Sequence, residues 1–187
     1  MQSHAHFIRT KLAAVIDAAK YSAIETLRDG RRIEIRAIQP GDQAGLLAAV
    51  EKSSVQSLHR RFFGVKRFFT DKEIAFFLNV DFVDHVALVA VLTEAGGTTI
   101  VGGGRYILVR PGAAEVAFAV VDEFQGQGVG AALMRHIAAI ARDAGLKELI
   151  AEVLPENSAM LKVFEKSGLR CRAQRESGTV HITLQLV

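Results

Sequence analysis

The chain has 187 residues, of which 50% are hydrophobic and 23% are charged. Such a chain can bury a sizeable core, and its composition is not that of a disordered protein. The 23 Lys and Arg residues exceed the 20 Asp and Glu residues by only three, and no dense basic stripe with interleaved aromatic residues is present. This balance argues against a protein that binds nucleic acid.

Cys171 is the only cysteine, so no disulfide can form within the chain and a reducing compartment is expected. The six histidines are scattered, and no metal site is predicted. No apolar run approaches the roughly 20 residues that a membrane-spanning helix needs, and charges interrupt the N-terminal region where a signal peptide has its apolar core. We therefore expect a soluble, cytoplasmic protein that binds no metal, membrane or nucleic acid.

Hydrophobic residues between positions 7 and 28 recur at near-helical spacing, with charges between them. This pattern predicts one amphipathic helix that ends before Asp29-Gly30, and thus an N-terminal helical extension over residues 1–30. Such a helix could mediate dimerisation into a homodimer, or regulation, or it could cover the core of its own domain. We favour the last interpretation because most amphipathic helices serve their own core.

Residues 31–187 have the pattern of one further domain without repeats. The predicted helices cover residues 42–50, 55–63, 71–79, 128–143 and 157–166. The predicted strands cover residues 32–38, 85–92, 100–109, 114–121, 148–154, 169–175 and 180–186. Turn signals join the second, third and fourth strands into an antiparallel meander. The order predicts an α+β fold with a mixed, mostly antiparallel sheet that is flanked by helices.

A glycine-rich loop between an apolar strand and a long helix is the densest chemical signal. It reads Gln125-Gly126-Gln127-Gly128-Val129-Gly130-Ala131. Glycine lets the backbone approach a ligand closely, and the start of the helix presents unpaired N–H groups and the positive end of its dipole. We therefore predict that this loop is a cradle for phosphate groups.

Two phosphate ligands fit this loop. Gly126, Gly128 and Ala131 satisfy the dinucleotide pattern G-x-G-x-x-[G/A], and Glu152 lies about 20 residues further on. That pattern normally opens a domain of successive parallel units, whereas here hairpin-linked strands precede the loop and only 56 residues follow it. Coenzyme A is therefore favoured. A tight turn that binds nothing explains one or two glycines more easily than three at alternate positions.

The same loop, read as Gln125-x-x-Gly128-x-Gly130, matches the Q/R-x-x-G-x-G/A signature of the GNAT superfamily of N-acetyltransferases. The segment 157–169 resembles the N-x-x-A-x-x-x-Y-x-K-x-G-F segment on the last helix of that family. The resemblance covers about residues 32–187, in the expected order of elements. Within the superfamily the chain looks most like bacterial protein-lysine acetyltransferases that modify acyl-CoA synthetases, and the resembling stretches are 57–63, 84–90 and 114–121.

This resemblance implies acetyl-CoA as the co-substrate. Backbone groups of Val120 and Val121 would hold the pantetheine arm and the thioester carbonyl. Asn157 matches an asparagine that contacts the cofactor in the family, although a helix cap explains it equally well. The pyrophosphate would be bound by amides of Gln125, Gly126, Gln127, Gly128, Val129, Gly130 and Ala131.

Transfer to a lysine requires a base, because the ammonium has a pKa near 10.4. Glu115 shares one face of its predicted strand with the small residues Ala117 and Ala119. Burial of an ionised carboxylate in a strand costs free energy unless the group has a partner. Glu115 is therefore either a functional residue or a residue that is exposed to water at the end of its strand. In the subfamily that the chain resembles, the general base is a glutamate on this strand, which implies Glu115. Phe164 replaces the tyrosine that many members use as the acid, so the proton donor stays open.

Together these observations predict transfer of an acetyl group from acetyl-CoA to an amine, by direct attack on the thioester with Glu115 as general base. A protein lysine is the favoured acceptor, with an acyl-CoA synthetase as one candidate protein. Two alternatives stay open at this point. One is a small-molecule amine N-acetyltransferase, and the other is a non-catalytic sensor that binds acyl-CoA.

Overall fold

The computed structural model describes residues 15–64, 66 and 68–187. Eight strands form one sheet in the order β1-β2-β3-β4-β5-β6-β8-β7. The strands are β1 Ser22–Thr26, β2 Arg32–Ala37, β3 His85–Glu94, β4 Gly97–Arg110, β5 Ala113–Val120, β6 Glu148–Val153, β7 Arg170–Glu176 and β8 Thr179–Gln185. The α-helices are α1 Gln43–Glu51, α2 Val55–Phe62, α3 Asp71–Leu78, α4 Val129–Asp143 and α5 Ser158–Glu165. Single 3₁₀ turns are η1 Ala18–Lys20, η2 Pro40–Asp42 and η3 Asp122–Phe124.

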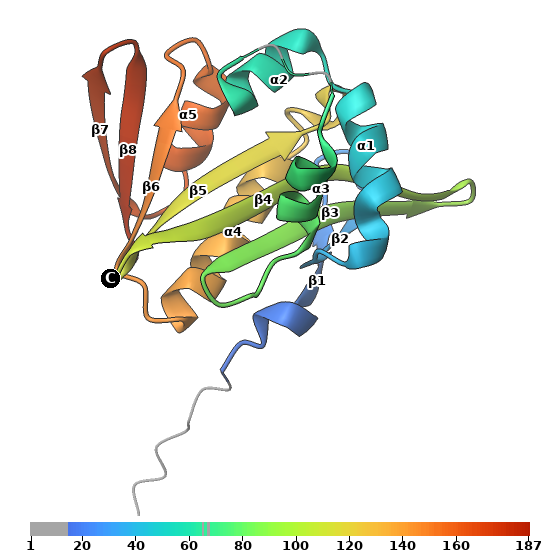
Figure 1. Cartoon of the computed structure of the whole chain (residues 1–187), viewed down its shortest axis with the longest axis horizontal. Helices are drawn as coiled ribbons and strands as arrows, with labels where there is room; N and C mark the ends of the chain where they lie inside the picture. Colours follow the sequence, from blue (N-terminus) through green and yellow to red (C-terminus); the bar gives the residue numbers. More distant parts are fainter. Residues whose placement is uncertain (1–14, 65, 67) are drawn as a thin grey trace, which may run out of the picture.

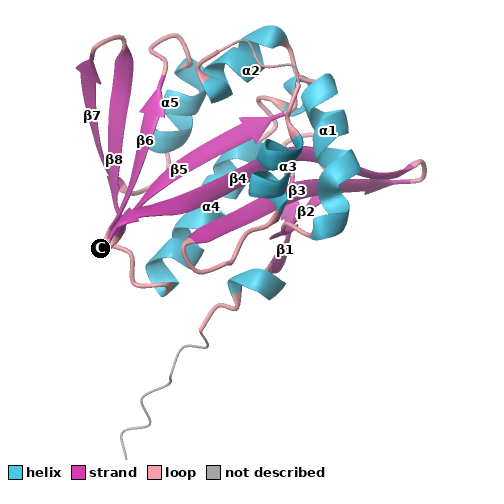
Figure 2. Cartoon of the chain, viewed as in Figure 1, coloured by secondary structure: helices cyan, strands magenta, loops and turns pink. Residues whose placement is uncertain are grey.

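The predicted α+β fold is confirmed. The predicted helices and strands of residues 31–187 all form, with bounds that differ by at most three residues. Strands β3, β4 and β5 make the expected antiparallel meander. Strand β6 then pairs with β5 in parallel, which makes the sheet mixed, and helices cover both of its faces (Figures 1 and 2).

The predicted N-terminal helix is wrong in its described part. Residues 15–28 hold the turn η1 and the strand β1, which pairs with β2 in antiparallel register, for example Ala23 with Ile35. Strand β2 otherwise has an edge of unpaired backbone N–H and C=O groups, and pairing with β1 satisfies them. The backbone hydrogen bonds to β2 stabilise a strand more than the spacing of the hydrophobic residues stabilises a helix. Residues 7–14 of the predicted helix lie outside the described residues.

The core lies on both faces of the sheet. The larger hydrophobic cluster packs α4 and α5 against one face, with Leu133, Ile137 and Phe164 among its buried members. The smaller cluster lies on the opposite face, where Leu46 of α1 and Ile74 of α3 pack against buried strand residues. The face under α1 and α3 therefore carries the smaller part of the hydrophobic core.

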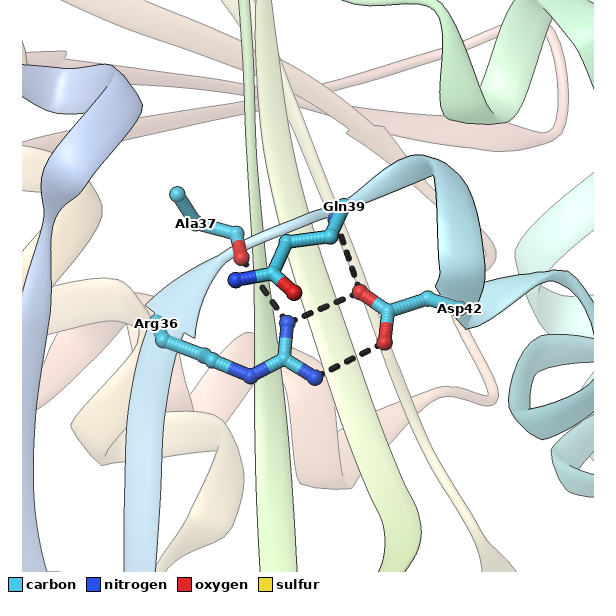
Figure 3. A network of polar contacts seen from close by, with 4 residues as sticks. All are labelled: Arg36, Ala37, Gln39 and Asp42. Atoms are coloured by element: carbon cyan, nitrogen blue, oxygen red, sulfur yellow. Dashed lines mark hydrogen bonds and ion pairs between the residues drawn. The ribbon is translucent and has the colours of Figure 1, made fainter.

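A partly buried ion pair connects β2 to the start of α1 (Figure 3). Arg36 donates from Nη1 to Asp42 Oδ2 at 2.8 Å and from Nη2 to Oδ1 at 2.7 Å. The Gln39 amide also donates to Asp42 Oδ2, at 2.7 Å. Burial raises the pKa of Asp42, but the bonds from Arg36 and Gln39 outweigh it and hold that pKa below its ordinary value. The pair thereby anchors α1 to the sheet.

No helix among residues 15–64, 66 and 68–187 is long and apolar enough to cross a membrane. Within the same residues, no three His, Cys, Asp or Glu side chains gather as ligands for a metal ion.

Candidate active site

The strands β5 and β6 run together for only three residue pairs, from Ala113 with Glu148 to Glu115 with Ile150. Beyond Glu115 the two strands part, as Figure 1 shows. A cleft of about 680 Å³ opens there, and it is lined by β4, β5, β6, α1, α2, α3, α5 and the start of α4. The geometry follows from the topology, because strands that stop pairing expose backbone groups that a ligand can bind.

The glycine-rich loop closes one end of this cleft. Gly126 and Gly128 have φ values of +76° and +100°, a region that L-residues rarely adopt. Arg28, in the turn between β1 and β2, holds the loop from outside. Its Nη1 donates to the Gly126 carbonyl at 2.9 Å and its amide donates to the Gln127 carbonyl at 3.1 Å.

The first turn of α4 directs backbone amides toward the same place. Ala132 donates to the Gly128 carbonyl at 2.9 Å, which is the first hydrogen bond of the helix. The preceding amides of Val129, Gly130 and Ala131 therefore have no carbonyl within the helix to bond to. Together with the helix dipole they suit a phosphate or another anion.

Glu115 stands at the other end of the cleft. Its side chain is exposed, and it shares a face of β5 with Ala117 and Ala119, as the alternation predicted. Val120 is five positions after Glu115, which corresponds to about 16 Å along a strand. The carboxylate and the phosphate cradle therefore lie at opposite ends of one cleft, and both line it.

Residues 53–169 match the model of the acetyltransferase (GNAT) family. The chain belongs to the GNAT family of acetyltransferases. Over 162 residues it is 32% identical to Acetyltransferase Pat of Mycolicibacterium smegmatis, a match that covers 86% of this chain and 46% of that relative. It is also 30% identical over 138 residues to Acetyltransferase PA5475 of Pseudomonas aeruginosa, covering 73% of this chain and 74% of the relative.

Among solved structures, the GNAT domain of S. lividans PAT superimposes with a TM-score of 0.79 at 36% identity, covering 88% of this chain and 96% of that one. Against Acetyltransferase Pat, the chain spans slightly less than half of the relative's length. The part of the GNAT domain that matches the family model includes the parted strands, the glycine-rich loop and α5.

Within this GNAT cleft, the structure places the predicted site residues as follows. Gln127 and Val129 do not line it, because the Val129 side chain is buried in the core and the Gln127 carbonyl is bonded to Arg28. The residues that do line it are Glu115, Val120, Val121, Gln125, Gly126, Gly128, Gly130, Ala131 and Asn157.

The backbone groups of Val121 form hydrogen bonds within the protein. Its amide donates to the Val101 carbonyl at 3.0 Å, and its carbonyl accepts from the Phe124 amide at 2.9 Å. Both groups are engaged because η3 turns the chain directly after β5. Val120 keeps its carbonyl on the cleft side, where it accepts from Gln125 Nε2 at 3.1 Å. A contact of Val120 or Val121 with the pantetheine arm stays a prediction.

Asn157 caps α5. Its Oδ1 accepts from the Met160 amide at 3.2 Å, so the helix-cap interpretation is confirmed. A contact between Asn157 and a cofactor stays a prediction. Phe164, which replaces the tyrosine of many GNAT members, is 1% exposed and packs against Phe118 with ring centroids 6.1 Å apart. It offers no proton to a leaving group.

Sequence reasoning missed Arg28, Ser57 and Arg105 as residues of this site. Ser57 accepts from Gln125 Nε2 at 3.0 Å and so ties α2 to the loop. Arg28 lies in the segment that was expected to be helical, which hid its role. Arg105 could have been found from the sequence, because a charged residue within an otherwise apolar strand needs a partner or has a function.

Proposed function

We propose that this GNAT domain transfers the acetyl group of acetyl-CoA to an amine, with a protein lysine as the acceptor. The observation that carries the proposal is the placement of Glu115 where β5 and β6 part, in the same cleft as the phosphate cradle at the start of α4. A carboxylate that can take a proton and a cradle that can hold pyrophosphate are the two groups this reaction needs most.

The residues of the cleft suit acetyl-CoA. Within the described part of the chain, the buried Nε of Arg60 has no hydrogen-bond partner, and Arg60 lines the cleft. A buried donor of this kind is costly unless a ligand accepts from it. The amides of Gly130 and Ala131 would hold the pyrophosphate, and Val120 would contact the pantetheine arm. Bound acetyl-CoA supplies the thioester that is attacked.

Glu115 would remove the proton of the acceptor amine, directly or through a water molecule. A lysine is almost fully protonated at neutral pH, so this step is required before attack. Apolar side chains of the cleft would help to orient the amine; they include the rings of Phe62, Phe69 and Phe77, which pack edge to face and line the same cleft as Glu115. Since Phe164 has no exchangeable proton, the leaving thiolate would be protonated by water, a backbone amide or another hydroxyl.

A protein acceptor is favoured over a small amine by exposed aromatic residues, of which Phe63 lines the cleft, while Phe68 and Phe76 are sequence neighbours of the lining residues Phe69 and Phe77. Three aromatic side chains on or beside α2 and α3 are exposed to water, Phe63 at 44%, Phe68 at 89% and Phe76 at 50%. Exposed apolar residues that gather beside a site are typical of a surface that contacts another macromolecule. The relative called Acetyltransferase Pat and the resemblance to enzymes that modify acyl-CoA synthetases support the same acceptor class.

The experiment incubates the purified protein with acetyl-CoA and a purified acyl-CoA synthetase, and a panel of small amines is run in parallel. Intact mass and peptide mapping would locate the acetyl group, and synthetase activity would be followed over time. We expect one lysine of the synthetase to gain 42 Da in proportion to the loss of its activity, roughly the mass change of one N-acetyl group.

The other outcomes are equally informative. Acetylation of small amines alone would assign the protein to the small-molecule class. Tight binding of acetyl-CoA with no acetylated product would support a sensor that binds acyl-CoA without catalysis and would contradict the proposal.

A further inference from the structure

Two arginines lie beside Glu115 at the reacting end of the cleft. Arg105 on β4 is paired with Ala117 on β5, so it is the diagonal neighbour of Glu115, a relation that corresponds to about 7–8 Å between strands. Arg61 on α2 reaches the same place from above the sheet. Arg61 lines the same cleft as Glu115, and α2 packs against β5. Burial lowers the pKa of Arg61, and the negative charge of Glu115 opposes this shift.

Neither guanidinium forms an ion pair within the described part of the chain. The hydrogen bonds and the ring contact of Arg105 are all with neutral groups. Its Nη1 contacts His85 Nε2 at 3.0 Å, and its guanidinium lies 4.6 Å from the centre of the Phe77 ring. Arg61 lies 4.9 Å from the centre of the Phe62 ring.

The ionisation of these groups follows from their surroundings. Burial, together with the positive charge of Arg61, lowers the pKa of Arg105 to about 9, so Arg105 stays charged at neutral pH. Burial and the charge of Arg105 lower the pKa of His85 to about 4, so His85 is neutral. Two positive side chains thus lie on the same side of the cleft as Glu115, and neither has a carboxylate partner in an ion pair among the described residues, so a further negative charge would be favourable here.

The phosphates of the co-substrate cannot supply that charge. Val120, the last residue of β5 before the loop of the phosphate cradle, is already about 16 Å along the strand from Glu115, and the cleft near the loop has its own cations in Arg28 and Arg60. The floor between the arginines is open, because Gly103, Ala117 and Ala119 have small side chains or none on this face.

We propose that Arg61 and Arg105 form a subsite for a carboxylate of the substrate beside Glu115. The inference rests on the proposed acyl transfer. One carboxylate would balance the charge of this end of the cleft, and it matches the planar fork of a guanidinium. It can come from the acceptor, as an acidic group next to the amine, or from the acyl group, as in succinyl-CoA. In both cases Glu115 takes one proton from the ammonium, the N–C bond forms as the C–S bond breaks, the nitrogen releases its second proton to solvent, and the thiolate takes a proton from solvent.

The test compares substrate pairs that differ only in a carboxylate. In the acceptor arm, acetyl-CoA is used with lysine peptides that carry Asp or Asn next to the lysine. In the acyl arm, succinyl-CoA is compared with butyryl-CoA. The proteins are the wild type, Arg61→Met, Arg105→Met and the control Arg175→Met, which removes an exposed arginine of β7.

We expect the wild type and Arg175→Met to prefer the carboxylate member of one pair by at least about tenfold in kcat/KM. A substrate without the carboxylate lacks a charge-assisted hydrogen bond, and the loss of such a bond corresponds to about this factor. Arg61→Met and Arg105→Met should reduce this preference to about threefold or less. The arm that shows the preference identifies the source of the carboxylate. Equal use of both members in both arms, or a preference that survives both substitutions, would overturn the proposal.

Binding measured without turnover separates this inference from the proposed function. Calorimetry gives the dissociation constants of succinyl-CoA and butyryl-CoA, and those of succinate and succinamide added to the CoA-saturated protein. If no acceptor is acylated, the proposed function fails, yet tighter binding of the carboxylate members that depends on Arg61 and Arg105 still supports the subsite. No difference between the members in either binding pair would contradict it.

Discussion

Glu115 and Ile150 face each other at the last residue pair that β5 and β6 share before the strands part. Glu115 therefore lies at the point where the gap between β5 and β6 begins, and it lines the cleft that opens there. The pairing of β5 with β6 places Glu115 there, because the parallel register ends at this position. The same register leaves the rest of β5 available to a ligand.

Replacing Glu115 by Gln should remove the base and keep the shape of the cleft. We expect kcat for acetyl transfer at neutral pH to fall by about 10²–10⁴-fold, the usual contribution of a general base. The dissociation constant of CoA should change by less than about twofold, since the lost interaction belongs to the transition state. Steady-state kinetics and calorimetry measure the two quantities.

The matched control is Glu176→Gln, at an exposed end of β7, which should behave as the wild type. A similar loss of kcat in both variants would refute the role of Glu115 as the base.

Replacing Gly128 by Ala should strain the phosphate loop. At a φ of +100° an L-residue costs about 1–2 kcal/mol, although a Cβ would meet no atom within 4 Å. We expect a lower free energy of unfolding and weaker CoA binding, measured by urea denaturation and calorimetry. Gly130→Ala, inside the first turn of α4, should keep or slightly raise the free energy of unfolding, because its Cβ would make ordinary contact with Val163 at 3.5 Å. Equal destabilisation by both variants would contradict the strain argument.

Replacing Arg28 by Gln should loosen the phosphate loop from outside. The variant loses the bond from Nη1 to the Gly126 carbonyl, and a lost hydrogen bond of about 1 kcal/mol corresponds to roughly a fivefold increase in the dissociation constant of CoA. The value of kcat at saturating acetyl-CoA should stay close to that of the wild type. Arg32→Gln removes an exposed arginine of β2 and serves as the control. An unchanged affinity in Arg28→Gln would show that the contact does not hold the loop.

Replacing Asp42 by Asn should cost stability in a pH-dependent manner. The Arg36–Asp42 pair is largely buried, and loss of one partner costs roughly 2–4 kcal/mol at neutral pH. The pKa of Asp42 in the folded protein is held below its ordinary value. The ionised carboxylate therefore contributes its full share to the free energy of unfolding above the pKa of the unfolded chain, about 3.9, and this contribution is lost as the pH falls through the lower pKa of the folded protein. The wild type and the variant should therefore converge in free energy of unfolding below about pH 4.

Urea denaturation at several pH values measures this convergence. Glu51→Gln, at the exposed end of α1, should not reproduce it. A difference between the wild type and Asp42→Asn that is independent of pH would mean that packing, and not the charge of Asp42, accounts for the loss.

The sequence by itself determined the parts of this protein that depend on neighbours along the chain. The meander β3–β5 follows from alternation and short turns, and α4 follows from its apolar period and the glycine-rich loop before it. Glu115 could be proposed as the base because the Ala-Glu-Val-Ala string matched a family pattern. These features need little information from distant segments.

Only the tertiary structure decided the rest. Strand β1 forms because the edge of β2 offers backbone partners, a gain that no local pattern reports, and Arg28 reaches the phosphate loop only once β1 is in the sheet. The engagement of the Val121 backbone depends on β4 and η3. The approach of Arg61 to Arg105 depends on how α2 crosses the sheet. Contacts between residues far apart in sequence are set by packing of whole elements, and hydrophobic periodicity determines only which face of each element is buried.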